Sequence, residues 1–145
     1  MTPQQIQLVR TSFALVEPIQ EQAAVLFYRR LFDLDPQLAT LFAGTDMARQ
    51  RQILMRTLSV VVHGLDRLDQ IGPGVANLGE RHVGYGVRGE DYGTVGAALI
   101  WTLEQGLGAA FTPGVREAWQ AAFGLLAGTM IGAAEQLTAR SEAAA

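Results

Sequence analysis

The chain has 145 residues, no cysteine and a formal net charge of −3, which suits one domain with a sizeable core. The lack of cysteine excludes disulfides, thiolate nucleophiles, iron–sulfur clusters, cysteine-ligated zinc and thioether-linked haem. An isoelectric point near 5.3 argues against nucleic acid or an anionic membrane as the partner. No apolar run reaches the ~18 residues of a membrane span, and no secretory signal is recognisable, so we expect a soluble, cytoplasmic protein.

The pattern of caps, prolines and apolar spacings predicts one all-α domain over residues 1–145. The first helix starts at Thr2-Pro3, where Gln5 completes a capping box, and Pro18 ends it and starts the second. No stretch alternates in polarity as a strand would. Further helices are expected at 35–42, at 46–66, in a short segment between the Gly72–Gly74 break and His82, at 90–107 and from Thr112 onward, with a disordered tail at about 139–145.

Four polar side chains lie on apolar helix faces at helical spacing: Tyr28, Gln50, His82 and Tyr92. An unpaired buried polar group costs about 1–3 kcal/mol, so each of these side chains needs a partner. A backbone carbonyl or a buried water would satisfy any one of them alone. Because they come from four different helices of one small domain, a shared polar centre is the favoured interpretation.

The chain has two histidines, and only His82 lies on an apolar face, because His63 falls about half a turn away from the apolar stripe of its helix. Met47 and Met55 are predicted to serve packing. Zinc requires three or four protein ligands, which one inward histidine does not supply. Haem needs only one or two protein ligands and therefore fits this sequence better than a metal held by side chains alone.

Five motifs, in this order along nearly the whole chain, resemble the single-domain bacterial haemoglobins of the flavohaemoglobin lineage, including the single-domain globins of thermophiles. The motifs are LFYRRLFDLDPQLATLF, RQRQILMRTL, LGERHVGYGV, EDYGTVGAALI and REAWQAAFGLLAG, the last of which surrounds Trp119. No single motif is specific, but their order and spacing are. The resemblance implies a globin fold, a three-on-three helical sandwich around haem b with no well-formed D helix.

The resemblance also assigns roles to residues. It implies that His82 is the one protein ligand of a five-coordinate iron, and that Tyr28 and Gln50 stabilise a small ligand such as O2, NO or CO on the opposite face. Arg81 would pair with a haem propionate or remain a solvated charge. The residues that the resemblance places around the haem are Phe27, Phe42, Leu54, Leu78, Arg81, Val87, Tyr92 and Met130.

One departure from the family concerns a last-helix glutamate that strengthens the proximal histidine in flavohaemoglobins. Ala134 stands at that position, and Glu135 is turned ~100° away along the helix. A second departure is that 145 residues leave no room for a flavin reductase domain, so electrons would come from an external reductase.

Three classes of function remain open at this stage. The first is reversible binding of oxygen or another diatomic gas, as in oxygen transport. The second is nitric oxide detoxification, in which a nitric oxide dioxygenase converts NO to nitrate with an external reductase. The third is a gas or redox sensor, or a haem-free helical interaction module. The oligomeric state cannot be predicted from this sequence.

Overall fold

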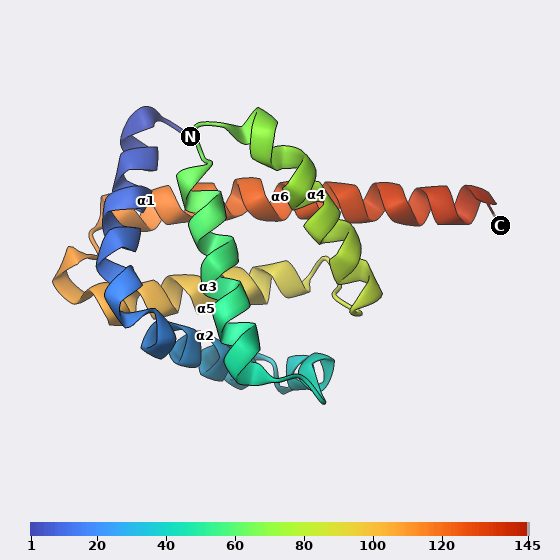
Figure 1. The fold of residues 1–145 in the computed structure, drawn as a ribbon, viewed down its shortest axis with the longest axis horizontal. Helices are drawn as coiled ribbons and strands as arrows, with labels where there is room; N and C mark the ends of the chain where they lie inside the picture. The colour runs from blue at the N-terminus through green and yellow to red at the C-terminus, as the bar shows by residue number, and fades with distance from the viewer. Residues whose placement is uncertain (145) are drawn as a thin grey trace.

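The computed structural model describes residues 1–144, and among these residues it contains helices and no strand, which confirms the all-α prediction (Figure 1). No helix of this part of the chain is long and apolar enough to cross a membrane. The elements are α1 (Pro3–Val16), η1 (Glu17–Ile19), α2 (Gln20–Leu34), η2 (Pro36–Phe42), α3 (Met47–His63), α4 (Leu68–Gly84), α5 (Asp91–Leu107), η3 (Gly108–Ala110) and α6 (Pro113–Ala144).

The predicted helix starts are confirmed by their capping bonds. Thr2 and Gln5 form the reciprocal capping box of α1, which satisfies two backbone groups that the helix leaves free. Asp35 accepts from the Gln37 N–H at the start of η2, and Asp46 accepts from the Arg49 N–H at the start of α3. Polar residues therefore fix where α1, η2 and α3 begin, whereas α2, α4 and α5 begin without a side-chain cap bond.

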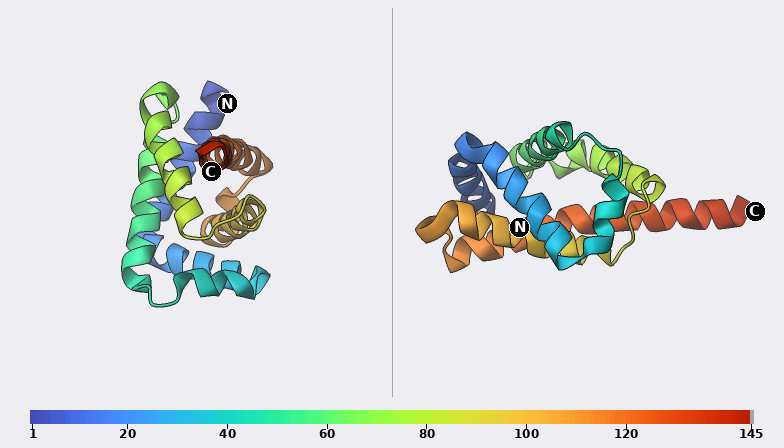
Figure 2. Two further views of the ribbon diagram at one scale, coloured as in Figure 1. Left: turned by 90° about the vertical axis from the view of Figure 1, so that its right-hand side faces the viewer. Right: turned by 90° about the horizontal axis from the view of Figure 1, so that it is seen from below.

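The helices pack in two crossing groups (Figure 1). Helices α5 and α6 run antiparallel to each other, and α1, α3 and α4 cross them. The largest contacts join α4 to α6, α2 to α5 and α1 to α6. Two further views show that α3 stands away from the α5–α6 pair (Figure 2), and the space between them contains the cavity described below.

The main hydrophobic core lies among α1, α2, α3, α5 and α6. Trp119 on α6 is buried in it, and its indole N–H donates to the Ser12 hydroxyl of α1 at 2.8 Å. This bond satisfies the one polar atom of a large apolar side chain. A smaller cluster of Tyr92, Ala127 and Met130 lies between α5 and α6, next to the helix that carries His82.

The predicted break at Gly72–Gly74 is wrong, because α4 continues from Leu68 to Gly84 with Pro73 inside it. Pro73 is the sixth residue of the helix, so it removes the backbone bond to the Asp69 carbonyl, near the helix start. Its fixed φ is compatible with a helix. Packing of α4 against α6 stabilises the remaining turns, which local propensity alone does not predict.

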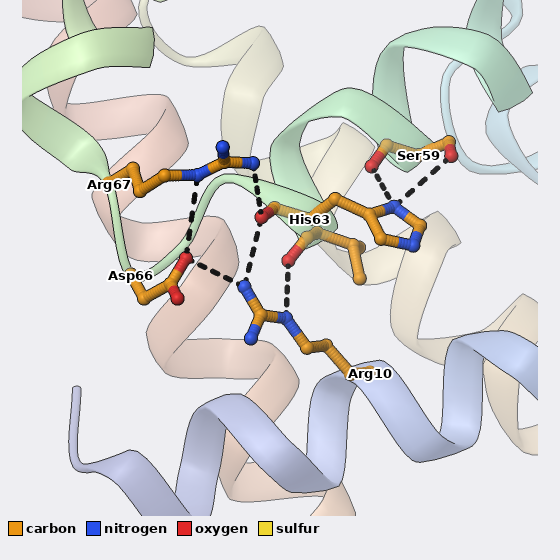
Figure 3. A network of polar contacts seen from close by, with 6 residues as sticks. Arg10, Ser59, His63, Asp66 and Arg67 are labelled. Carbon is orange, nitrogen blue, oxygen red and sulfur yellow. Dashed lines mark hydrogen bonds and ion pairs between the residues drawn. The ribbon is translucent and has the colours of Figure 1, made fainter.

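Two helix ends also differ from the prediction. Helix α3 ends at His63 rather than near residue 66, and Gly64 is its C-cap. Arg10 of α1 donates to the carbonyls of Val62 and His63 at 3.3 and 2.9 Å, which are acceptors that the last turn leaves free (Figure 3). At the other end of the chain, residues 139–144 continue α6 as helix, whereas the sequence predicts a disordered tail from about residue 139; residue 145 lies outside the described residues.

Candidate functional site

His82 lies in the last turn of α4 and is half-buried. Its Nδ1 lies 2.7 Å from the Leu78 carbonyl. Because a carbonyl can only accept, Nδ1 carries the proton and Nε2 keeps a lone pair. Burial lowers the pKa of His82, the bond to Leu78 opposes this, and the charge of Arg81 lowers it further. The ring is therefore neutral near pH 7 and can act as a nitrogen ligand.

Two glycines hold His82 in place. A Cβ on Gly79 would lie only 2.5 Å from the Met130 carbonyl oxygen and 2.6 Å from the Met130 Cα, so α4 meets the backbone of α6 directly at this point. Gly86 has a φ of +87°, a conformation that glycine adopts without strain, and the turn there bonds the Val87 N–H back to the His82 carbonyl. Helix α4 therefore ends abruptly at Gly84, within the same turn as the histidine.

Tyr28 and Gln50 meet across α2 and α3. The Gln50 side-chain amide donates to the Tyr28 hydroxyl oxygen at 3.0 Å. Tyr28 is buried, and its ring packs edge-on against Phe27 and Phe42. Burial raises the pKa of Tyr28, while the Gln50 bond and the Arg51 charge oppose the rise. The hydroxyl therefore stays protonated, and its proton remains free to donate because Gln50 occupies only the oxygen.

These side chains line one cavity of about 210 Å³, hereafter the site cavity. Its walls are mostly leucine, valine and phenylalanine, whose side chains offer water no hydrogen bonds. The structure brings together all but one of the residues that the sequence predicts for the site. The predicted residues that line it are Phe27, Tyr28, Phe42, Gln50, Leu54, Leu78, His82, Val87, Tyr92 and Met130.

Arg81 is the predicted site residue that does not line the site cavity. Its side chain is exposed, and it acts on His82 through its charge alone. The residues that the sequence places outside the site also lie where it predicts. His63 is exposed, and Met55 is buried in the core. Glu135 is exposed, while Ala134 is half-buried.

Asp91 is a cavity residue that the sequence analysis missed. It is buried at the start of α5 and lines the site cavity. Its carboxylate accepts the Arg88 backbone N–H at 2.8 Å and lies 3.5 Å from the Arg88 guanidinium. Burial raises the pKa of the neighbouring Tyr92, and the Asp91 charge adds to this rise. The only sequence signal was an acidic residue at a helix start, which is ordinarily solvated.

The arrangement fits a haem with one axial ligand from the protein. His82 offers an Nε2 lone pair, and apolar walls surround the cavity. Within residues 1–144, no three histidine, aspartate or glutamate side chains gather where they could hold a metal ion. A metal that brings most of its own ligands therefore fits these residues, as haem iron does.

Comparison with known proteins identifies the family to which the chain belongs. The sequence model of the globin family matches residues 25–130, and the chain belongs to that family. Over 139 residues the chain is 28% identical to a Flavohemoprotein of Bacillus subtilis (strain 168), a match that covers 94% of this chain and 35% of that protein. The chain thus spans about a third of that relative's length.

Two solved structures share the fold. A bacterial globin from Campylobacter jejuni superposes with a TM-score of 0.82 at 22% identity, covering 94% of this chain and 99% of that one. An engineered carbene transferase from Rhodothermus marinus, whose parent is described as a candidate nitric oxide dioxygenase, gives a TM-score of 0.87 at 23% identity, covering 98% and 99%. The globin fold predicted from the sequence is confirmed, and family membership implies a haem site.

Proposed function

We propose that this globin is a haem b protein that binds dioxygen and other diatomic gases at a five-coordinate iron, with His82 as its one protein ligand. The observation that carries the proposal is the bond between His82 Nδ1 and the Leu78 carbonyl at 2.7 Å. That bond fixes the ring orientation and leaves Nε2 as the ligand atom. When bound, haem supplies the iron coordination position at which diatomic gases bind.

The residues of the chain around the site cavity determine how firmly a small ligand is held there. Tyr28 and Gln50 place donors on one side of the site cavity, and hydrogen bonds to a charged or strongly polarised ligand contribute about 1.5–3 kcal/mol. Phe27, Phe42 and Leu54 line the same cavity and keep water from competing for those donors. Tyr92 and Met130 would contact the ring from the side of α5 and α6, and Arg81 would reach a propionate at the surface.

The two histidines provide a matched test. Each has its Nδ1 at 2.7 Å from the carbonyl four residues earlier, and Figure 3 shows this contact for His63. His63, however, is exposed and does not line the site cavity. His82→Ala should abolish normal haem retention, together with the thermal stabilisation that a bound group gives by mass action. His63→Ala should leave the visible spectra of the ferric, ferrous and ferrous-CO forms unchanged. An unchanged spectrum in the His82 variant would overturn the proposal.

A second function, conversion of nitric oxide to nitrate, uses the same cavity. It is supported by the Tyr28–Gln50 donor pair and by the name of the Rhodothermus marinus parent. Nitric oxide, dioxygen and one electron together balance to one nitrate. The electron would come from an external reductase, so repeated turnover in the presence of a reductase separates this function from gas binding.

A further inference from the structure

Asp91 is an acidic side chain for which the function proposed above has no role. It is the first residue of α5, and the loop 85–90 joins it to the end of α4 that carries His82 (Figure 1). Its side chain is only 4% exposed, and it is the one carboxylate among residues 1–144 that lines the site cavity. Aspartate is almost never fully buried unless it is paired, so the balance of charge around Asp91 determines how it acts on the cavity.

Arg88 is the one basic partner of Asp91 in the described part of the chain, and it is shared. The Asp91 carboxylate accepts the Arg88 backbone N–H at 2.8 Å and lies 3.5 Å from the Arg88 guanidinium. The same guanidinium lies 2.7 Å from Glu90, and the Arg88 side chain is 61% exposed. One solvated guanidinium thus faces two carboxylates, which leaves one net negative charge. The partial positive charge at a helix start, about half a unit, offsets only part of it.

The bond to the Arg88 N–H holds the loop before α5 in place, but it does not require a charge. A backbone N–H needs only an acceptor oxygen, which the amide of asparagine also supplies. A carboxylate makes the bond stronger, but burying a charge costs far more than burying an amide. The bond therefore accounts for an acceptor at position 91 and leaves the charge itself unexplained.

The charge of Asp91 acts on groups that face the site cavity. Tyr92 also lines this cavity, and its pKa is raised by burial first and by the Asp91 charge second. The effective dielectric constant between groups in a protein is about 20, against about 80 in bulk water. A charge in the cavity wall therefore acts over longer distances than a solvated one, and it opposes any change that removes positive charge from the cavity.

We propose that the Asp91 carboxylate stabilises the ferric form of a haem bound in the site cavity and so lowers its reduction potential. This role rests on the haem site proposed above. One electron from the external reductase converts ferric to ferrous iron, which removes one positive charge from the cavity, while no bond or proton changes at Asp91. Because the buried negative charge favours the more positive state, the protein needs a stronger reductant than it would need without Asp91.

Asp91→Asn removes the charge and keeps an acceptor for the Arg88 N–H. Spectroelectrochemical titration of the haem-bound protein at pH 7 measures the reduction potential. The potential should rise, so that the ferrous-to-ferric ratio at a fixed potential increases about tenfold, equivalent to ~59 mV for one electron. The matched control is Glu90→Gln, which removes the same charge one residue away, where the side chain is 68% exposed. Water and salt screen that position, so the ratio should change less than about twofold.

Arg88→Gln tests the same charge from the opposite sign. The substitution removes the guanidinium but not the backbone N–H that Asp91 accepts, so the loop keeps that bond. Without its positive partner the carboxylate acts more strongly, and the reduction potential should fall. Shifts of opposite sign in Asp91→Asn and Arg88→Gln identify an effect of charge, because a loosened loop would change the haem environment in the same direction in both variants.

Visible spectra and circular dichroism melts identify the variants that fold and bind haem. If the unaltered protein binds no haem, the proposed function and the role of Asp91 fail together. If haem is bound and Asp91→Asn moves the potential no more than Glu90→Gln does, the role of Asp91 fails while the proposed function stands. If Asp91→Asn does not retain haem, Arg88→Gln decides, and a potential that does not fall overturns the role of Asp91.

Discussion

At the scale of single residues, the Tyr28–Gln50 pair has a defined direction. The Gln50 amide donates to the Tyr28 oxygen at 3.0 Å, so the tyrosine proton is left to point into the site cavity. Because burial raises the pKa of Tyr28 above 10, this proton is retained throughout the neutral range. Gln50 thus positions the tyrosine in addition to any contact of its own with a ligand.

This geometry predicts the effect of removing each donor. Tyr28→Phe should speed dioxygen dissociation by about 10- to 100-fold, the equivalent of one charge-assisted hydrogen bond. Gln50→Ala should have a smaller effect, because Tyr28 keeps its proton and its buried position. Stopped-flow displacement of dioxygen by CO measures both rates. Dissociation that is unchanged in both variants would mean that neither donor reaches the ligand.

Single residues also show where sequence reasoning stops. Tyr28, Gln50 and His82 could be predicted because helical spacing places each of them on an apolar face, and a family motif surrounds each. Asp91 could not be predicted, because its burial depends on how the loop before α5 folds back so that the Arg88 N–H meets its carboxylate. An acid at a helix start has the same local pattern whether it is buried or solvated.

At the scale of helices, the contact between Gly79 and Met130 places His82. A Cβ at position 79 would meet main-chain atoms of α6, which cannot move aside as a flexible side chain can. Helix α4 would have to shift, and the imidazole would shift with it. The close approach is invisible in the sequence, where Gly79 is one of 16 glycines.

Gly79→Ala should therefore destabilise the protein by about 1–3 kcal/mol, the usual range for overpacking, and should weaken haem retention. The control is Gly74→Ala in the same helix, where a Cβ meets nothing within 4 Å. Alanine there should stabilise the helix by up to about 1 kcal/mol. Urea unfolding with haem titration measures both effects. Equal stability of the two variants would show that α4 adjusts to the added methyl group freely.

Helix α4 also shows how packing overrides local preference. The Gly-Pro-Gly sequence at 72–74 predicts a break, and local propensity gives no reason to expect otherwise. In the structure the helix passes through Pro73 because its other face packs on α6. The starts of α1, η2 and α3, by contrast, could be predicted, since a cap acts through residues only two or three positions away.

Arg10 connects α1 to the end of α3, and it gives part of the stability a pH dependence. Its guanidinium lies 2.8 Å from the Asp66 carboxylate (Figure 3), and this hydrogen bond is the largest cause of the lowered pKa of Asp66. A carboxyl group whose folded pKa lies below the unfolded value of 3.8 stabilises the folded state above that value. The stabilisation is lost as the pH falls through the folded pKa.

Asp66→Asn should therefore lower the free energy of unfolding at neutral pH. In acid the variant has no carboxylate at this position to protonate, so this position causes no further loss of stability. Urea midpoints of the unaltered protein and the variant should converge as the pH falls below 3.8, the ordinary value for this carboxyl. Arg10→Gln should be more damaging at neutral pH, since it also removes the donors to the Val62 and His63 carbonyls. A gap between the Asn variant and the unaltered protein that persists unchanged in acid would contradict this assignment.

At the scale of the whole molecule, the chain corresponds to the globin portion of its longer relatives. It spans 35% of the Bacillus subtilis Flavohemoprotein, so the activity of that whole protein is a hypothesis here. The lining of the site cavity is mostly apolar, and its polar members include Tyr28, Gln50, His82 and Asp91. That combination suits both gas binding and gas conversion, and the cavity alone does not choose between them.

The supply of electrons distinguishes gas binding from nitric oxide conversion. Given excess dioxygen, nitric oxide, NAD(P)H and a reductase fraction, a nitric oxide dioxygenase should form many equivalents of nitrate per protein, because each turnover consumes one electron from outside the cavity. A stirred nitric oxide electrode with nitrate analysis measures this. His82→Ala should abolish it, and Tyr28→Phe should slow it because dioxygen is held less long. If nitrate stops at one equivalent with every reductant tried, while dioxygen binding remains reversible, the dioxygenase hypothesis fails and gas binding describes the protein.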